Sequence, residues 1–176
     1  MDVVNKNKDK FSVLNTLLTV HYDNMDQNDF VRKQIESRIA EYLNQGCSVY
    51  NFSTFQHPPT REKVRQITSP SEDAWIDYDL GSQVEQLMPL LKEAHKSTPF
   101  QEIELIGVTW WKCVEYARQL LIERGVPTYI NYDYTDLVPD YIGIKELDMV
   151  VLINGKPIPT PSEKVMGRYR ASMKEK

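Results

Sequence analysis

The sequence predicts an α/β fold, a three-layer α/β/α sandwich built on a mostly parallel sheet. Strand-like and helix-like segments alternate along the chain as β-α-β, then a loop, then α-β-α-β. Residues 103–132 read as strand, turn, helix and strand, with the crossover length that two parallel strands need. The chain has 176 residues, enough to bury one sizeable core and too few for two comfortable domains.

The N-terminal elements follow from apolar spacing and capping residues. A run of apolar residues predicts the first strand at Leu14–Tyr22. A helix through about Asn44 follows, with Asn28 or Asp26 as its N-cap and Gly46 just past its end. The second strand is expected at Cys47–Phe52.

The middle of the chain is less regular. Residues Thr60–Asp73 are polar and proline-interrupted, which predicts a mobile loop or lid. Trp75–Tyr78 predicts a short extended piece, and Gly81–His95 an amphipathic helix that Pro89 bends or restarts. A strand is then expected over Phe100–Gly107.

A cysteine at the start of the next helix is the best single candidate for chemistry. The turn that begins at Gly107 leads into Cys113, and apolar spacing predicts a helix over Trp111–Arg124 with Gly125 as its C-cap glycine. Backbone N–H groups and the positive end of the helix dipole favour a thiolate at such a position. Ligands of open parallel sheets bind beyond the carboxyl ends of strands, where this turn is expected.

The C-terminal part closes the sheet and adds a hairpin. Val126–Tyr132 is rich in β-branched and aromatic residues and predicts a strand parallel to Phe100–Gly107. Met149–Ile153 predicts another strand, and Asn154-Gly155 a tight hairpin turn. The resulting organisation is a flexible arm at 1–12, a single domain at 13–160 and a charged tail at 161–176.

Composition excludes several classes of function. A formal net charge of −4 with interspersed lysines and glutamates gives no basic stripe, so we expect no nucleic-acid partner. No apolar run is long enough for a membrane span and Met1–Lys10 is too polar for a signal peptide, which predicts a cytoplasmic protein. The two cysteines have no metal-ligand spacing, so we expect no metal and no cofactor, and Cys47 reads as a small buried strand residue.

The cysteine turn resembles that of the isochorismatase-like cysteine hydrolases, the family that contains the nicotinamidases. Its residues are Gly107-Val108-Thr109-Trp110-Trp111-Lys112-Cys113-Val114, with Ala117 where the family has a small helix residue. The first strand, its helix and Gln56-His57-Pro58 are similar in the same order, so the resemblance covers about residues 14 to 136. It implies an isochorismatase-like fold, a cysteine nucleophile, and assembly into a homo-oligomer.

The resemblance also implies a Cys–Asp–Lys triad, from which this chain departs. The aspartate position holds His21, with Asp23 two residues later. Trp75 or Asp77 stands where the lysine is expected, and Lys63 lies far upstream. The family's frequent metal ligands around His57 are missing as well, since Phe55 precedes it and no histidine follows nearby.

One interpretation of these residues is a divergent hydrolase with a small-molecule substrate. Cys113 attacks a small amide, ester or vinyl ether, His21 is the general base, and Asp23, on the same side of the strand, orients the imidazole. Backbone N–H groups of Thr109 and Cys113 form the oxyanion hole. The candidate substrate-binding residues are Thr109, Trp110, Trp111 and His57. The alternatives without a catalytic role are that His21 is a hydrogen-bonded structural residue, that the tryptophans lie in the core, and that His57 is a turn residue.

The other interpretation is a catalytically inactive protein of the same fold that binds a protein partner as a regulator or inhibitor. A missing lysine and a displaced aspartate fit that interpretation. So does an aromatic surface, for which the candidates are Tyr129, Tyr132, Tyr134 and Tyr141. A nucleotide-binding domain is the third class, but Gly107 stands without the glycine pattern that phosphate binding needs.

Overall fold

The computed structural model of the chain describes residues 15–25, 30–53, 62–68, 76–96, 100–108, 113–135, 152–153 and 156–157. Several features predicted from the sequence lie outside these ranges: the arm at 1–12, the tail at 161–176, the caps Asp26 and Asn28, and the site residues His57, Thr109, Trp110 and Trp111.

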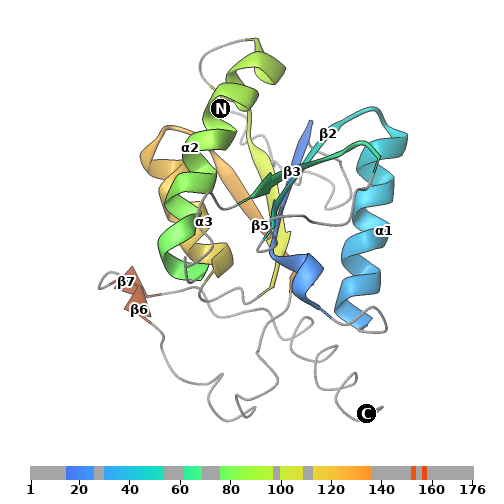
Figure 1. Cartoon of the computed structure of the whole chain (residues 1–176), viewed down its shortest axis with the longest axis horizontal. Coiled ribbons are helices and arrows are strands. Elements are labelled where there is room, and N and C mark those ends of the chain that lie inside the picture. The colour runs from blue at the N-terminus through green and yellow to red at the C-terminus, as the bar shows by residue number, and fades with distance from the viewer. Residues whose placement is uncertain are drawn as a thin grey trace, which may run out of the picture.

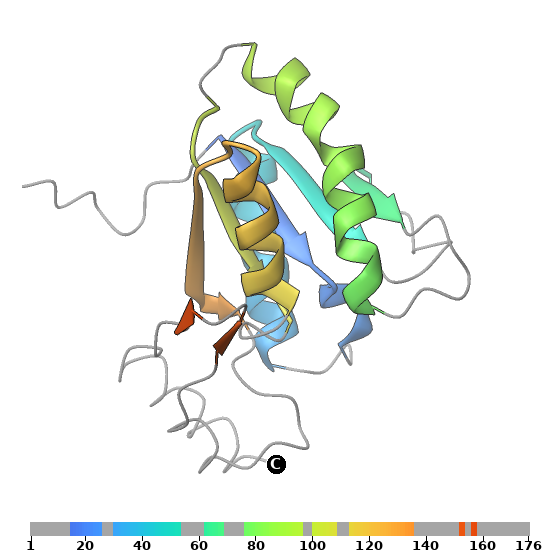
Figure 2. The ribbon, with the colours of Figure 1, turned by 90° about the vertical axis from the view of Figure 1, so that its left-hand side faces the viewer.

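A five-stranded parallel sheet forms the middle layer of the fold. Its strands, in spatial order, are β3 (Val64–Thr68), β2 (Ser48–Ser53), β1 (Thr16–Val20), β4 (Ile103–Gly107) and β5 (Thr128–Thr135). Each neighbouring pair is parallel. The helix α1 (Phe30–Asn44) covers one face, while α2 (Ile76–His95) and α3 (Glu115–Glu123) cover the other (Figure 1 and Figure 2). The predicted three-layer α/β/α architecture is confirmed.

Two apolar cores fill the spaces between these layers. The first lies under α2 and α3 and includes Leu18, Val20, Leu87, Leu105 and Cys113. The second lies under α1 and includes Leu17, Ile35, Ile39, Tyr42 and Ile106. Successive residues of a strand point to opposite faces, so β1 and β4 contribute to both cores.

The structure corrects the prediction of a loop at Thr60–Asp73. Residues Val64–Thr68 form β3, the edge strand beside β2. Val64 packs into the core under α1, whereas Ile67 packs into the core under α2. With one apolar residue for each face, β3 lacks the period-2 alternation by which a strand is recognised in a sequence.

The helix after β3 is also longer than predicted. It begins at Ile76, so residues 76–78 are helical and not extended, and it continues through Pro89 without a break. Pro89 lies at an exposed position of α2. Among the described residues, no helix has the length and apolar character needed to cross a bilayer.

Two turn predictions agree with the structure, whereas Cys47, expected as a buried strand residue, is only partly buried and directly precedes β2. Gly46 and Gly125 have left-handed φ values of 73° and 77° just past the ends of α1 and α3, as C-cap glycines do. The Asn154-Gly155 signal is confirmed by a two-stranded antiparallel hairpin, β6 (Leu152–Ile153) and β7 (Lys156–Pro157).

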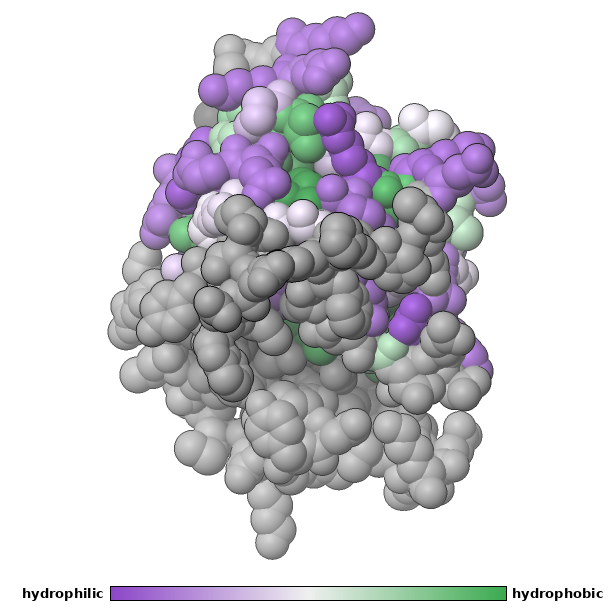
Figure 3. All heavy atoms as spheres, in the orientation of Figure 1, coloured by the Kyte–Doolittle hydropathy of each residue, from purple (hydrophilic) through white to green (hydrophobic). Residues whose placement is uncertain are grey.

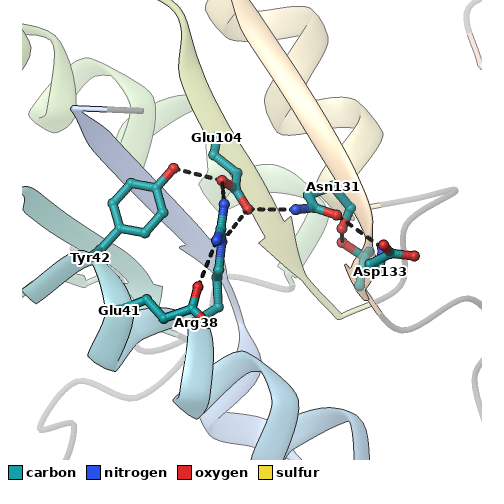
Figure 4. A network of polar contacts seen from close by, with 7 residues as sticks. Arg38, Glu41, Tyr42, Glu104, Asn131 and Asp133 are labelled. Atoms are coloured by element: carbon teal, nitrogen blue, oxygen red, sulfur yellow. Dashed lines mark hydrogen bonds and ion pairs between the residues drawn. The ribbon is translucent and has the colours of Figure 1, made fainter. Parts of the chain in front are cut away.

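A buried ion pair joins α1 to β4, and a hydrogen bond from Asn131 extends the network to the edge strand β5 (Figure 4). The carboxylate of Glu104, 1% exposed, accepts two hydrogen bonds from the Arg38 guanidinium, at 3.0 and 2.6 Å, and one from the Tyr42 hydroxyl at 2.6 Å. It also accepts a hydrogen bond from Asn131 Nδ2, 2.8 Å away in β5. The pairing of β4 and β5 shifts after Leu105, and the carbonyl of Asn131 accepts a bond from Thr135 across that irregularity.

Candidate active site

The carboxyl edge of the sheet gathers the candidate catalytic residues. His21 directly follows β1, Gly107 ends β4, and β1 and β4 are neighbours in the sheet. The α3 helix runs back along the sheet from this edge (Figure 2). Cys113 lies two residues before Glu115, the first residue of α3, and is therefore at this edge as well. This is the position at which open parallel sheets bind ligands.

Cys113 lies in a widened helical turn at the start of α3. Cys113 and Val114 form a π-helical turn, and the regular α-helix starts at Glu115. Such turns are rare and are frequent at functional sites. The Cys113 side chain is 6% exposed and packs into the core under α2 and α3. The thiol is therefore shielded from bulk water while it lies at the positive end of a helix.

Gly107 brings the ends of β1 and β4 into contact. Its φ is 147°, and a Cβ atom built on it would lie 2.3 Å from the carbonyl oxygen of Val20. The backbone N–H of Val108 donates to the same oxygen at 2.9 Å. Only glycine permits this approach, which places the turn leading to Cys113 directly beside the residue before His21.

The acidic residue nearest to Cys113 in the sequence, Glu115, is paired with an arginine. Glu115 is buried in the first turn of α3, where it complements the helix dipole. Its carboxylate accepts from Arg118 Nε at 2.7 Å and from Gln119 Nε2 at 3.3 Å. Because Arg118 balances Glu115, the helix start retains a positive field for a thiolate at Cys113.

His21 has a strained backbone at the end of β1. Its φ of 54° and ψ of 23° lie in the left-handed region, and its side chain is buried. Its backbone N–H donates to the carbonyl oxygen of Phe52 at 2.9 Å, which fixes this conformation against β2. Left-handed backbone at a non-glycine residue is uncommon and clusters at functional sites.

The structure corrects the expectation that His21 and Asp23 share one side of a strand. The strand β1 ends at Val20, and Asp23 lies in the 3₁₀ turn η1 (Tyr22–Asn24). Within the described residues, the Asp23 carboxylate accepts a hydrogen bond from the Ser53 hydroxyl, and none from the imidazole. The rule that residues two apart in a strand point to the same side therefore does not apply to His21 and Asp23.

Gln83 is a residue at this edge that the sequence analysis missed. It is 0% exposed, and its Nε2 donates to the carbonyl oxygens of Ser53 at 2.8 Å and Ile67 at 2.9 Å. It joins the N-terminal part of α2 to the ends of β2 and β3. The available signal was a glutamine inside the apolar stripe formed by Leu80, Val84 and Leu87.

Lys63 does not supply the lysine of the expected triad at this edge of the sheet. Lys63 is exposed and directly precedes β3, so it lies at the amino edge of the parallel sheet, opposite Cys113. Trp75 lies outside the described residues, and Asp77 lies in α2. Among the described residues, no three His, Cys, Asp or Glu side chains gather as metal ligands.

The predicted aromatic surface is only partly described. Tyr129 on β5 is 47% exposed, and Tyr134 is half-buried against Arg38. Tyr141 and the side chain of Tyr132 lie outside the described residues. Figure 3 shows that the described residues of one face are mostly hydrophilic, with hydrophobic residues in narrow strips between them. The described part of that face therefore shows no broad apolar area.

Comparison with known proteins supports the fold. No protein-family model matches the chain, and no curated protein sequence matches it significantly. A solved structure, that of the nicotinamidase SaPncA from Staphylococcus aureus, is similar with a TM-score of 0.52 and 15% sequence identity. The match covers 73% of this chain and 88% of the nicotinamidase chain. At this identity the likeness establishes a shared architecture, and the chain has an isochorismatase-like α/β fold.

Proposed function

We propose that this chain is a cysteine hydrolase that cleaves a small amide, ester or vinyl ether. The observation that carries the proposal is the position of Cys113, in a π-helical turn at the start of α3 and at the carboxyl edge of the sheet. The likeness to a nicotinamidase makes hydrolysis the first reaction class to test. His21, at the end of the neighbouring strand, is the proposed general base.

For an amide or ester, the reaction is a double displacement through a thioester. The imidazole of His21 accepts the thiol proton, and the Cys113 sulfur attacks the carbonyl carbon. The C–N or C–O bond breaks, and the leaving group takes that proton from the imidazolium. Water then attacks the thioester, gives a proton to His21 and releases the acid and the thiolate. The backbone N–H of Cys113 is a donor for the oxyanion in both halves of the reaction.

The competing candidate is a binding protein that has kept the fold without catalysis. The 6% exposure of Cys113 and the histidine in place of an aspartate favour this candidate. The two candidates differ in one measurable property, the pH at which the Cys113 thiol ionises.

The experiment is the pH dependence of Cys113 alkylation in a Cys47→Ser background. An activated thiol reacts well below the pH of about 8.5 at which a free cysteine ionises. His21→Asn, which tolerates the left-handed backbone, is expected to return the midpoint toward that value while the fold persists. The same protein in denaturant provides the free-thiol reference, so slow access to the buried sulfur does not confound the midpoint.

The activity test is a screen of small amides, esters and vinyl ethers with the same proteins. Loss of the base is expected to lower the rate by about 10²- to 10⁴-fold, and Cys113→Ser to abolish thioester formation. A midpoint near 8.5 in every variant, with no turnover, would refute the hydrolase and favour the binding protein.

A further inference from the structure

We propose that Asp23, Ser53 and Gln83 form a subsite that binds the ammonium group of a ligand. The three residues meet where β2 ends, beside the N-terminal part of α2. That the ligand is also the substrate rests on the proposed function, because the subsite lies at the same edge of the sheet as Cys113. The binding of an ammonium group does not depend on a reactive thiol.

The amide of Gln83, which contacts the last residue of β2, carries a buried acceptor. Its nitrogen donates to two strand carbonyls, which fixes the amide orientation, since the oxygen could not serve those acceptors. Within the described part of the chain, Oε1 accepts no hydrogen bond, although the side chain is 0% exposed. A buried acceptor without a donor is unfavourable by about 1–3 kcal/mol, which a donating ligand would recover.

Asp23 presents a second acceptor, and Ser53 links it to Gln83. One carboxylate oxygen accepts from the Ser53 hydroxyl, whereas the other, Oδ1, is buried and accepts nothing from the described residues. Ser53 thus contacts Asp23 through its side chain and Gln83 through its backbone carbonyl. Asp23 Oδ1 and Gln83 Oε1 are both hydrogen-bond acceptors. The complementary group of a ligand is therefore a hydrogen-bond donor.

The charge of Asp23 selects a cationic donor over a neutral one. Arg32, a buried arginine on α1, donates to Glu36 at 3.1 Å and to the carbonyl oxygen of Met25. Hydrogen bonds between a carboxylate and a cationic N–H group are about twice as strong as neutral ones. A primary ammonium has three donors, which suits two acceptors on different elements.

The test is ligand-observed NMR titration of the Cys113→Ala protein with benzylamine, benzyl alcohol and benzoate. Benzylamine is expected to bind at least about tenfold more tightly than benzyl alcohol, and benzoate the most weakly. Asp23→Asn keeps an oxygen for Ser53 but replaces the open acceptor with an N–H donor. This variant is expected to lose the preference for benzylamine.

Gln83→Leu and Gln86→Leu form a matched pair of variants. Gln86 donates to the carbonyl oxygen of Thr68 from an exposed position, so its loss removes a helix-to-strand bond without touching the subsite. We expect weaker benzylamine binding in Gln83→Leu alone, and if that variant does not fold, Asp23→Asn decides. Equal binding of benzylamine and benzyl alcohol, or an unchanged preference in Asp23→Asn, would overturn the subsite. Because Cys113 is absent throughout, either result is independent of whether the chain is a hydrolase.

Discussion

Gly107 controls the geometry of the carboxyl edge at the scale of one residue. Gly107→Ala would place a Cβ atom 2.3 Å from a backbone oxygen that cannot move without breaking β1. We expect the free energy of unfolding to fall by about 3 kcal/mol or more, measured by urea denaturation. Gly81→Ala is the control, since nothing lies within 4 Å of that position in α2 and alanine should stabilise the helix by up to about 1 kcal/mol. A mild effect at Gly107 would contradict the close approach.

Single residues were unequally predictable from the sequence. Cys113 was identifiable because a polar, reactive residue stood between a strand pattern and a helix pattern. Gln83 and Glu104 were not, because a buried polar residue within an apolar pattern gives no indication of its partner. Their partners are 16 to 66 residues away, and only the folded sheet brings them together.

At the scale of the elements, the ion pair of Glu104 and Arg38 joins α1, β4 and β5. Burial works to lower the pKa of Arg38, but the hydrogen bonds to Glu104 and Glu41 outweigh it and raise that pKa above its ordinary value. Glu104→Gln is expected to lower the free energy of unfolding by about 3–5 kcal/mol, because the buried Arg38 then loses its buried counter-charge and keeps only the half-exposed Glu41. Urea denaturation measures this difference.

The control for that variant is Glu41→Gln, at the half-exposed end of the same network. Its pair with Arg38 is partly screened by water, so we expect a loss of at most about 1 kcal/mol. Equal losses in the two variants would show that the buried carboxylate has no special role in holding the three elements.

The contact between the end of α2 and the start of β1 is expected to contribute a pH-dependent stability. His95 lies 3.1 Å from the hydroxyl of Thr16 through Nε2, and its Nδ1 accepts from the backbone N–H of Gln101. Burial lowers the pKa of His95 below 6.5. The unfolded chain therefore binds the proton more readily, so the stability contributed by neutral His95 is complete above about pH 6.5 and declines as the pH falls toward the folded-state pKa.

His95→Gln is expected to reduce this pH dependence. We expect the free energy of unfolding of the unmodified chain to fall more steeply between about pH 7 and 5 than that of the variant. The difference between the two slopes isolates His95 from the other histidines. Parallel slopes would show that His95 does not titrate differently on folding.

At the scale of the whole molecule, the layers were predictable and one edge of the sheet was not. Alternating strand and helix patterns indicated β1, β2, β4 and β5 in the correct order. The edge strand β3 was missed because its five residues divide two apolar side chains between opposite faces. The edge of the sheet that gathers the site was predictable from topology, whereas the turn η1, which separates His21 from Asp23, was not.

The division of the central strands between two cores predicts cooperative unfolding. Leu17 and Leu18 are neighbours in β1 but lie in different cores, so neither core can open without moving the backbone that supports the other. Leu87→Ala, under α2, and Ile35→Ala, under α1, should each lower the free energy of unfolding by about 2–5 kcal/mol. In each variant the midpoint of a single unfolding transition should fall. Far-UV circular dichroism and labelling of Cys113 in a Cys47→Ser background should report the same midpoint. Separate midpoints for the two probes in either variant would show that the faces of the sheet unfold independently.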